Sequence, residues 1–299
     1  MTARAAFLER AKAVAIALAW IVAFSAVGFT VSWALGHWPR PTGQWLRAWG
    51  SGAAALGFGF ATWLVGRRLD RRSWDALGWR PRTGMPLGLV AGVACGAVMA
   101  LAAIGLAVLG GATVRWTGDA TPWGSVALPL AAALIVAALF EELLFRGYPL
   151  RRLADAVGAA PATLAAALGF GLAHLGNPSA TALSTVNVAL AGVWLACAFF
   201  SPGAMPLAWG AHFGWNATLA LGFDAPVSGY VFGVPGIAYQ PGPHAWLDGR
   251  AFGPEGGIVT TVVMIAGTAA LVAWTRRAGA GAGAGGGTLA GAQTGGKAA

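Results

Sequence analysis

Long apolar runs, separated by short polar segments, make up most of this chain. A run of about 20 apolar residues is long enough to cross the hydrocarbon core of a bilayer as a helix. The runs of about this length are residues 13–36, 48–66, 84–110, 124–146, 159–176, 180–200, 204–222 and 256–274. The pattern predicts an all-α fold: a multi-pass integral membrane helix bundle with about eight transmembrane helices.

Composition and charge support this class and give it an orientation. Hydrophobic residues make up 57% of the sequence and charged residues 10%, which excludes an ordinary soluble domain. Arg4, Arg10 and Lys12 precede the first run, so the positive-inside rule predicts a cytoplasmic N-terminus. If the chain crosses the membrane at each of the eight spans, the C-terminus is cytoplasmic too. Of the basic residues, only Arg40, Arg47, Arg115 and Arg250 then lie outside. The basic residues flank apolar runs and form no continuous patch, so we predict no nucleic-acid partner.

Three regions follow from the same pattern. Residues 1–12 are predicted to be a cytoplasmic segment, and residues 13–277 the membrane domain. Residues 278–299 are mostly Gly and Ala and have too little apolar side-chain surface to offset the entropy of ordering, so we predict a disordered tail. The loop over 223–255 is rich in Gly and Pro, which predicts a structured cap without long regular elements.

A pair of adjacent glutamates lies in the fourth apolar run. Burying one carboxylate at membrane depth costs about 2.5–3.5 kcal/mol even on lenient scales, so Glu141 and Glu142 call for a functional explanation. Arg146 follows Glu142 by four residues, the favourable spacing and order for a helical ion pair. Glu141 lies about 100° around the helix and cannot share that partner equally. We therefore predict a structural role for Glu142 and a catalytic one, as general base, for Glu141.

The next span carries Phe170 and His174 on one helix face. If the two spans form a hairpin that turns near residues 157–158, Glu141 and His174 are each about 16 residues from the turn. At 1.5 Å per residue both would then lie at a similar depth, about 24 Å from the tip.

A third span carries His212 and Asn216, again four residues apart and on one face. Neither side chain belongs in contact with lipid, so both are expected to face a polar cavity shared with Glu141 and His174. The structural alternative is that these residues are hydrogen-bonding contacts between helices, a frequent role for intramembrane His and Asn.

These residues form three motifs that resemble those of a known family. The sequences Glu-Glu-Leu-Leu-Phe-Arg (141–146), Phe-Gly-Leu-Ala-His (170–174) and His-Phe-Gly-Trp-Asn (212–216) are similar to the motifs of the CAAX protease and bacteriocin-processing (CPBP or Abi) family of intramembrane proteases. The resemblance covers residues 124–222. It implies an eight-helix fold with a cavity opening toward the cytoplasm. It also implies that Glu141 and His174 activate water while His212 and Asn216 stabilise the oxyanion.

The same residues leave the metal question open. Glu141, His174 and His212 could supply three zinc ligands with one open position. They could also work without metal, through a glutamate base and hydrogen-bond donors to the developing oxyanion. The dense His-Glu-x-x-His spacing of many zinc proteases is absent from the sequence, so we favour no cofactor.

The sequence thus predicts an intramembrane endopeptidase of the bacterial cytoplasmic membrane, with a membrane-associated peptide or protein as substrate and the bilayer as its other partner. One alternative is a non-catalytic bacteriocin immunity or scaffold protein. Another is a proton-coupled transporter that uses Glu141 as a relay, although no symmetric half-repeat is visible.

Overall fold

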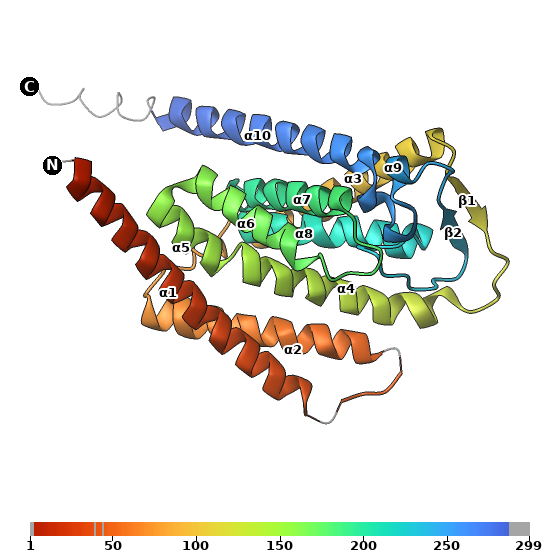
Figure 1. The fold of residues 1–299 in the computed structure, drawn as a ribbon, viewed down its shortest axis with the longest axis horizontal. Coiled ribbons are helices and arrows are strands. Elements are labelled where there is room, and N and C mark those ends of the chain that lie inside the picture. The colour runs from red at the N-terminus through yellow and green to blue at the C-terminus, as the bar shows by residue number, and fades with distance from the viewer. Residues whose placement is uncertain (1–2, 39, 44, 287–299) are drawn as a thin grey trace, which may run out of the picture.

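The computed structural model describes residues 3–38, 40–43 and 45–286 and consists mainly of helices (Figure 1). The long helices are α1 (Ala3–Gly36), α2 (Trp45–Ala61), α3 (Met85–Leu109), α4 (Trp123–Phe145), α6 (Ala159–Ala173), α7 (Ala182–Phe200), α8 (Ala204–Ala217) and α10 (Ile258–Gly286). The shorter elements are α5 (Tyr148–Val157), α9 (Ala245–Asp248), β1 (Thr113–Trp116), β2 (Ile237–Gln240), the π-helical segments Thr62–Leu69 and Thr218–Gly222, and the 3-10 turns Arg250–Phe252 and Pro254–Gly256.

The helical membrane class is confirmed. Five helical segments are long and apolar enough to cross a bilayer: Arg4–Gly36, Met85–Leu109, Trp123–Val157, Ala182–Phe200 and Ile258–Ala278. The other three predicted spans also coincide with helices, namely α2 with its π-helical extension, α6, and α8 with its extension. The total of eight membrane crossings and the cytoplasmic placement of both termini stay predictions.

The helices run between two ends of the molecule (Figure 1). The described parts near both termini lie at one end, and the β1–β2 ribbon and α9 lie at the other, which we call the ribbon end. The α1–α2 pair packs on α4, α6 packs on α7, and α10 runs along α7 and α3. The α3–α8 pair makes the most extensive helix–helix contact of the structure.

The α3–α8 contact depends on glycine. A Cβ on Gly92 would come within 2.4 Å of the Leu207 carbonyl oxygen, and one on Gly96 within 2.0 Å of the Ala211 oxygen. Gly210 and Gly214 of α8 are equally close to the α3 backbone. Small residues at four-residue spacing let membrane helices approach backbone to backbone, and here they fix the helix that carries His212.

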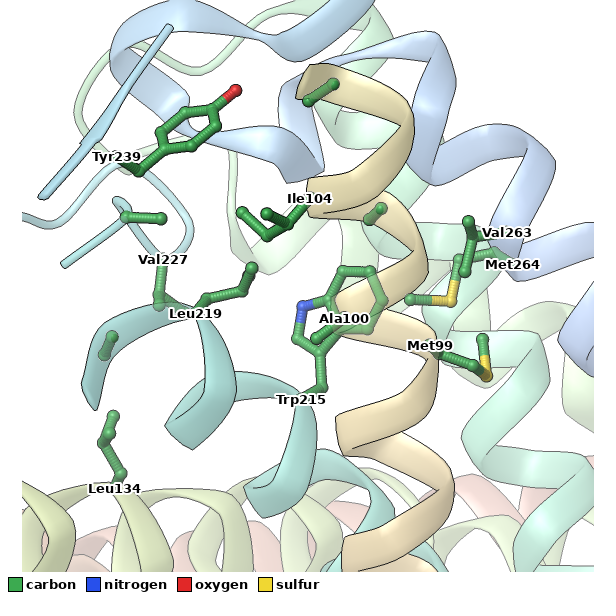
Figure 2. Packing of buried hydrophobic residues seen from close by; sticks show 14 of the residues in the cluster. Met99, Ala100, Ile104, Leu134, Trp215, Leu219, Val227, Tyr239, Val263 and Met264 are labelled. Carbon is green, nitrogen blue, oxygen red and sulfur yellow. The ribbon is translucent and has the colours of Figure 1, made fainter. Parts of the chain in front are cut away.

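The largest buried cluster lies at the ribbon half of this helix pair (Figure 2). Trp215 of α8 and Leu219 of the π-helical segment after it pack with Met99 and Ile104 of α3, and Met264 of α10 closes the cluster. The cluster continues into the segment after α8, so the same core holds both α8 and the cap that follows it.

The cap over 223–255 contains only short elements, and one of them pairs with a strand that the sequence did not reveal. Strands β1 and β2 are antiparallel, with Thr113 opposite Gln240 and Trp116 opposite Ile237. Strands this short show too little alternation for a sequence pattern to detect them.

An ion-pair cluster ties α5 to the segment after α2 at the end that carries the termini. Asp70 contacts Arg72 at 2.9 Å and Arg152 at 3.5 Å, and it accepts a hydrogen bond from the Tyr148 hydroxyl at 3.1 Å. Asp155 pairs with Arg151 at 3.2 Å and also with Arg72. These contacts hold the helix that follows the two glutamates.

The C-terminal boundary differs from the prediction. Helix α10 continues to Gly286, so residues 278–286 of the predicted disordered tail are helical. This stretch contains four alanines and five glycines, and glycine is a poor helix former, so helix propensity does not explain the extension. The remainder of the predicted tail, 287–299, lies outside the described residues.

The close α3–α8 contact predicts that Gly96→Ala destabilises the protein by about 1–3 kcal/mol, since an overpacked interface must separate. Gly105→Ala is the matched control, because that glycine lies on the same helix with no atom within 4 Å of a Cβ. The measurement is thermal unfolding in detergent. Unfolding is detected by the reaction of Cys95 and Cys197 with a thiol-reactive dye as the two thiols become accessible. Equal unfolding temperatures for the two variants would contradict the packing argument.

Candidate active site

The two glutamates lie in the last turns of α4, where the chain bends into α5. The backbone N–H groups of Arg146 and Gly147 both donate to the Glu142 carbonyl, at 2.8 and 2.9 Å, and end the helix. Pro149 follows in the first turn of α5. The bend holds the Glu141 and Glu142 side chains at the centre of the bundle, next to α6 and α8.

Glu142 is fully buried and has two partners. Its Oε1 accepts hydrogen bonds from Arg146 Nη1 at 3.2 Å and from His212 Nδ1 at 2.9 Å. Arg146 is also buried, and its guanidinium lies 4.0 Å from the centroid of the Phe170 ring. A buried ion pair needs such extra contacts to offset its desolvation. Phe170 therefore supports Arg146, which holds Glu142, which in turn orients His212.

His174 caps the C-terminal end of α6. Its Nδ1 lies 2.8 Å from the Phe170 carbonyl oxygen, which can only accept, so Nδ1 carries the proton. The His174 and Phe170 rings pack edge to face, with centroids 4.7 Å apart. These contacts leave Nε2 facing Glu141, at 3.9 Å from Oε2. The structure thus brings Glu141 and His174 to the same depth.

His212 approaches Glu141 from α8. Its Nε2 lies 3.7 Å from Glu141 Oε2. Both histidine-to-glutamate distances are too long for direct hydrogen bonds, and such gaps suit a bridging water or a reacting atom. Because Nδ1 donates its proton to Glu142, neutral His212 can only accept at Nε2. It can donate there only as an imidazolium, for which the two carboxylates provide counter-charge.

Asn216, one turn further along α8, completes the group. It lines the cavity next to Glu141 together with His174 and His212. Among the described residues its side chain has no hydrogen-bond partner, so its amide is available to a ligand. All four residues with predicted catalytic roles thus meet at one cavity.

This main cavity has a volume of about 770 Å³ and runs from Glu141 toward the ribbon end. Its far walls come from the first turns of α2, with Arg47, and from the cap, with Tyr230 and Phe232. The Arg47 guanidinium lies 5.5 Å from the centroid of the Phe232 ring and joins the two walls.

The main cavity therefore runs away from the end that carries the termini. The opening toward the cytoplasm that the resemblance implies stays a prediction, because the side of the membrane on which each end lies is itself a prediction. A separate cavity of about 570 Å³ lies near the end that carries the termini, between Trp74, Trp79 and Leu143. Neither glutamate lines it, nor do His174, His212 and Asn216.

The donor set fits a metal only in part. Each histidine donates through Nδ1 and leaves Nε2 toward Glu141, which is how zinc ligands are usually oriented. Tetrahedral zinc, however, holds its N and O ligand atoms about 3.3–3.6 Å apart, and here the distances are 3.7 and 3.9 Å. Within the residues that the structure describes, no three His, Cys, Asp or Glu side chains are grouped to hold a metal ion. The orientation of the histidines thus suits a zinc site, whereas the spacing to Glu141 is longer than zinc ligation requires. The use or absence of a metal stays a prediction.

Sequence reasoning missed two features of the site. The bond from His212 to Glu142 joins residues 70 positions apart, and no local spacing reveals it. Glu255, buried in the cap, accepts hydrogen bonds from Trp215 Nε1 at 2.8 Å and from the backbone and hydroxyl of Ser228. An acidic residue between glycines in Phe-Gly-Pro-Glu-Gly-Gly (252–257) is the signal that could have pointed to it.

Comparison with known proteins agrees with the motif analysis. Residues 122–218, about a third of the chain, match the family model described as type II CAAX prenyl endopeptidase Rce1-like. No curated protein and no solved structure matches the chain. The matched region contains all three motifs, so the resemblance to the CAAX protease family is confirmed: residues 122–218 are similar to the Rce1-like type II CAAX prenyl endopeptidases.

Proposed function

We propose that the protein is an intramembrane endopeptidase that hydrolyses a peptide bond of a membrane-associated substrate with water activated by Glu141. The family likeness supports endopeptidase chemistry. The observation that carries the proposal is the position of the Glu141 carboxylate, which faces the main cavity with the Nε2 atoms of two histidines 3.7 and 3.9 Å away. A water molecule between these three groups would be held and polarised together.

In the proposed reaction, the water oxygen attacks the carbonyl carbon of the scissile bond while Glu141 takes one of its protons. The tetrahedral intermediate carries a negative oxygen. Glu141 then gives its proton to the amide nitrogen, the C–N bond breaks, and a new carboxylate and amine are released. His174 accepts a hydrogen bond from the attacking water through Nε2 and helps to orient it.

Two groups on α8 would stabilise the oxyanion. Asn216 can donate through its amide, and His212 through Nε2–H in its imidazolium form, which the Glu142 contact supports. Donors about 2.7–3.1 Å from the developing charge are the largest single contribution in many acyl-transfer enzymes. The i, i+4 spacing on one helix lets both donors reach the same oxygen.

The metal-free mechanism is the one we favour. The interatomic distances at Glu141 exceed those of a zinc site, and the side chains suffice for base, oxyanion and proton-transfer roles. The zinc-dependent alternative would use Glu141, His174 and His212 as ligands.

The other function classes explain less of the geometry. A scaffold or bacteriocin immunity protein needs no convergence of Glu141, His174, His212 and Asn216 on one cavity. A proton-coupled transporter needs a polar path to both ends, whereas the main cavity runs from Glu141 toward the ribbon end alone. The apolar helices and the charge distribution support a multi-pass location in the bacterial cytoplasmic membrane.

Glu141→Gln should abolish cleavage while the protein stays folded and membrane-inserted, because the variant keeps the shape and loses the base. Comparing membrane proteomes of cells that express wild type or this variant would reveal substrates as fragments present only with wild type. Glu9→Gln, an exposed change on α1, is the matched control and should behave as wild type. Unchanged cleavage by Glu141→Gln would contradict the proposed mechanism.

His212→Ala should lower kcat by about 10²–10³, the scale for loss of one oxyanion donor, with little change in KM. Purified active protein should contain no stoichiometric metal, and a chelator should leave its activity unchanged. Elemental analysis of wild type and His212→Ala tests both statements. About one zinc per active chain, lost together with activity in His212→Ala, would replace the metal-free mechanism with the zinc-dependent one.

A further inference from the structure

A second, much smaller cavity lies beside the two histidines. Its volume is about 30 Å³, which is room for one or two water molecules. Its walls come from α6, α7, α8, the cap and the start of α10. It is separate from the large apolar cavity between α3, α7 and α10.

Half of the residues that line this small cavity are polar. The polar residues are His174, Asn187, His212, Asn216, Ser228, Glu255 and Thr260. Cavities of this size with several polar partners hold ordered water, whereas apolar ones stay dry. The chemistry of the wall therefore identifies water as the ligand.

One wall residue has a buried donor that needs a partner. Trp194 is 1% exposed, and its indole Nε1 has no hydrogen-bond partner among the described residues. A buried unpaired N–H is costly, and native proteins usually satisfy such a group with protein or water. Trp194 lines both the small cavity and the apolar cavity between α3, α7 and α10. Of these two, the small cavity has the polar wall residues that can hold a water for this donor.

Acceptors and a second donor complete the site. A carboxylate has about four acceptor positions, and Glu255 uses three of them for Trp215 Nε1 and the two donors of Ser228. Its fourth position and the unpaired Asn216 amide remain for water. Asn187 is already engaged with the Glu255 and Gly257 carbonyls at 2.8 Å, so it braces the wall.

The small cavity and the main cavity share part of their walls. His174, His212, Asn216 and Ser228 line both. The two cavities therefore adjoin at these four side chains, and Glu141 lines the main cavity on the other side of them. A peptide that fills the main cavity displaces its water, since much of the lining there is apolar, but it cannot occupy the small cavity beside the histidines.

We propose that the small cavity is a hydration site that supplies the attacking water to Glu141 while the peptide fills the main cavity. This inference rests on the proposed function and adds a source for its nucleophile. The water passes between His174, His212 and Asn216, and after hydrolysis its oxygen is in the new carboxylate. Glu255 holds Ser228 of the shared wall and Trp215, which lines the small cavity alone.

Ala191→Val tests this by adding two methyl groups to the wall of the small cavity. Ala94→Val is the matched control, since it makes the same change within a helix at the apolar cavity of α3. We expect Ala191→Val to lower kcat about tenfold or more with KM unchanged, and Ala94→Val to leave both constants unchanged. The assay uses the full chain in proteoliposomes and a peptide spanning a cleavage site found by the proteome comparison.

A high-resolution experimental structure gives a readout that does not depend on activity. It should contain an ordered water within hydrogen-bond distance of Trp194 Nε1 or the Asn216 amide in wild type and none there in Ala191→Val. If Ala191→Val does not fold, Trp194→Phe replaces it: removal of the donor should lower kcat and leave KM unchanged. A dry cavity in wild type, or full kcat in the variant without the water, would overturn the proposal. Activity retained by Glu141→Gln would instead refute the proposed function, which is a distinguishable result.

Discussion

The shared carboxylate of Glu142 is the contact on which the geometry of the site depends. It is buried between Arg146 and His212, so it joins α4 to α8 and fixes which nitrogen of His212 carries the proton. Removing a buried carboxylate from such a pair costs about 3–5 kcal/mol, because the cation left behind is uncompensated. Phe170 lies against the Arg146 guanidinium and so links this contact to the helix that ends at His174. The three motifs are therefore connected by direct side-chain contacts. Glu141 takes no part in these contacts and faces the main cavity.

Helix α8 carries this arrangement to the rest of the molecule. Its glycines bring it against the α3 backbone, and Trp215 on the same helix bonds to Glu255 in the cap. The cap in turn forms a wall of both cavities through Ser228. The helix that presents His212 and Asn216 is thus held along its length by backbone contact and by the segment that closes the ribbon end of the site.

The sequence predicted the helices and the group of catalytic candidates because both follow from local spacing. Apolar runs give spans, and four-residue intervals place Glu142 with Arg146, Phe170 with His174, and His212 with Asn216 on common faces. The His212–Glu142 bond and the Glu255 contacts were not predictable, since they depend on how helices distant in sequence rotate and pack. The course of the main cavity was not predictable either, because its walls include the irregular cap. The helical start of the predicted tail shows that a low apolar content does not by itself end a helix.

The central claim is that Glu141 activates water and does not attack the peptide itself. A single turnover in water enriched in oxygen-18, followed by mass spectrometry of the product and the enzyme, tests this most directly. Our account predicts one heavy oxygen in the new carboxylate of the product and none in the Glu141 side chain. Heavy oxygen in Glu141 would reveal a covalent acyl-enzyme intermediate and contradict the claim.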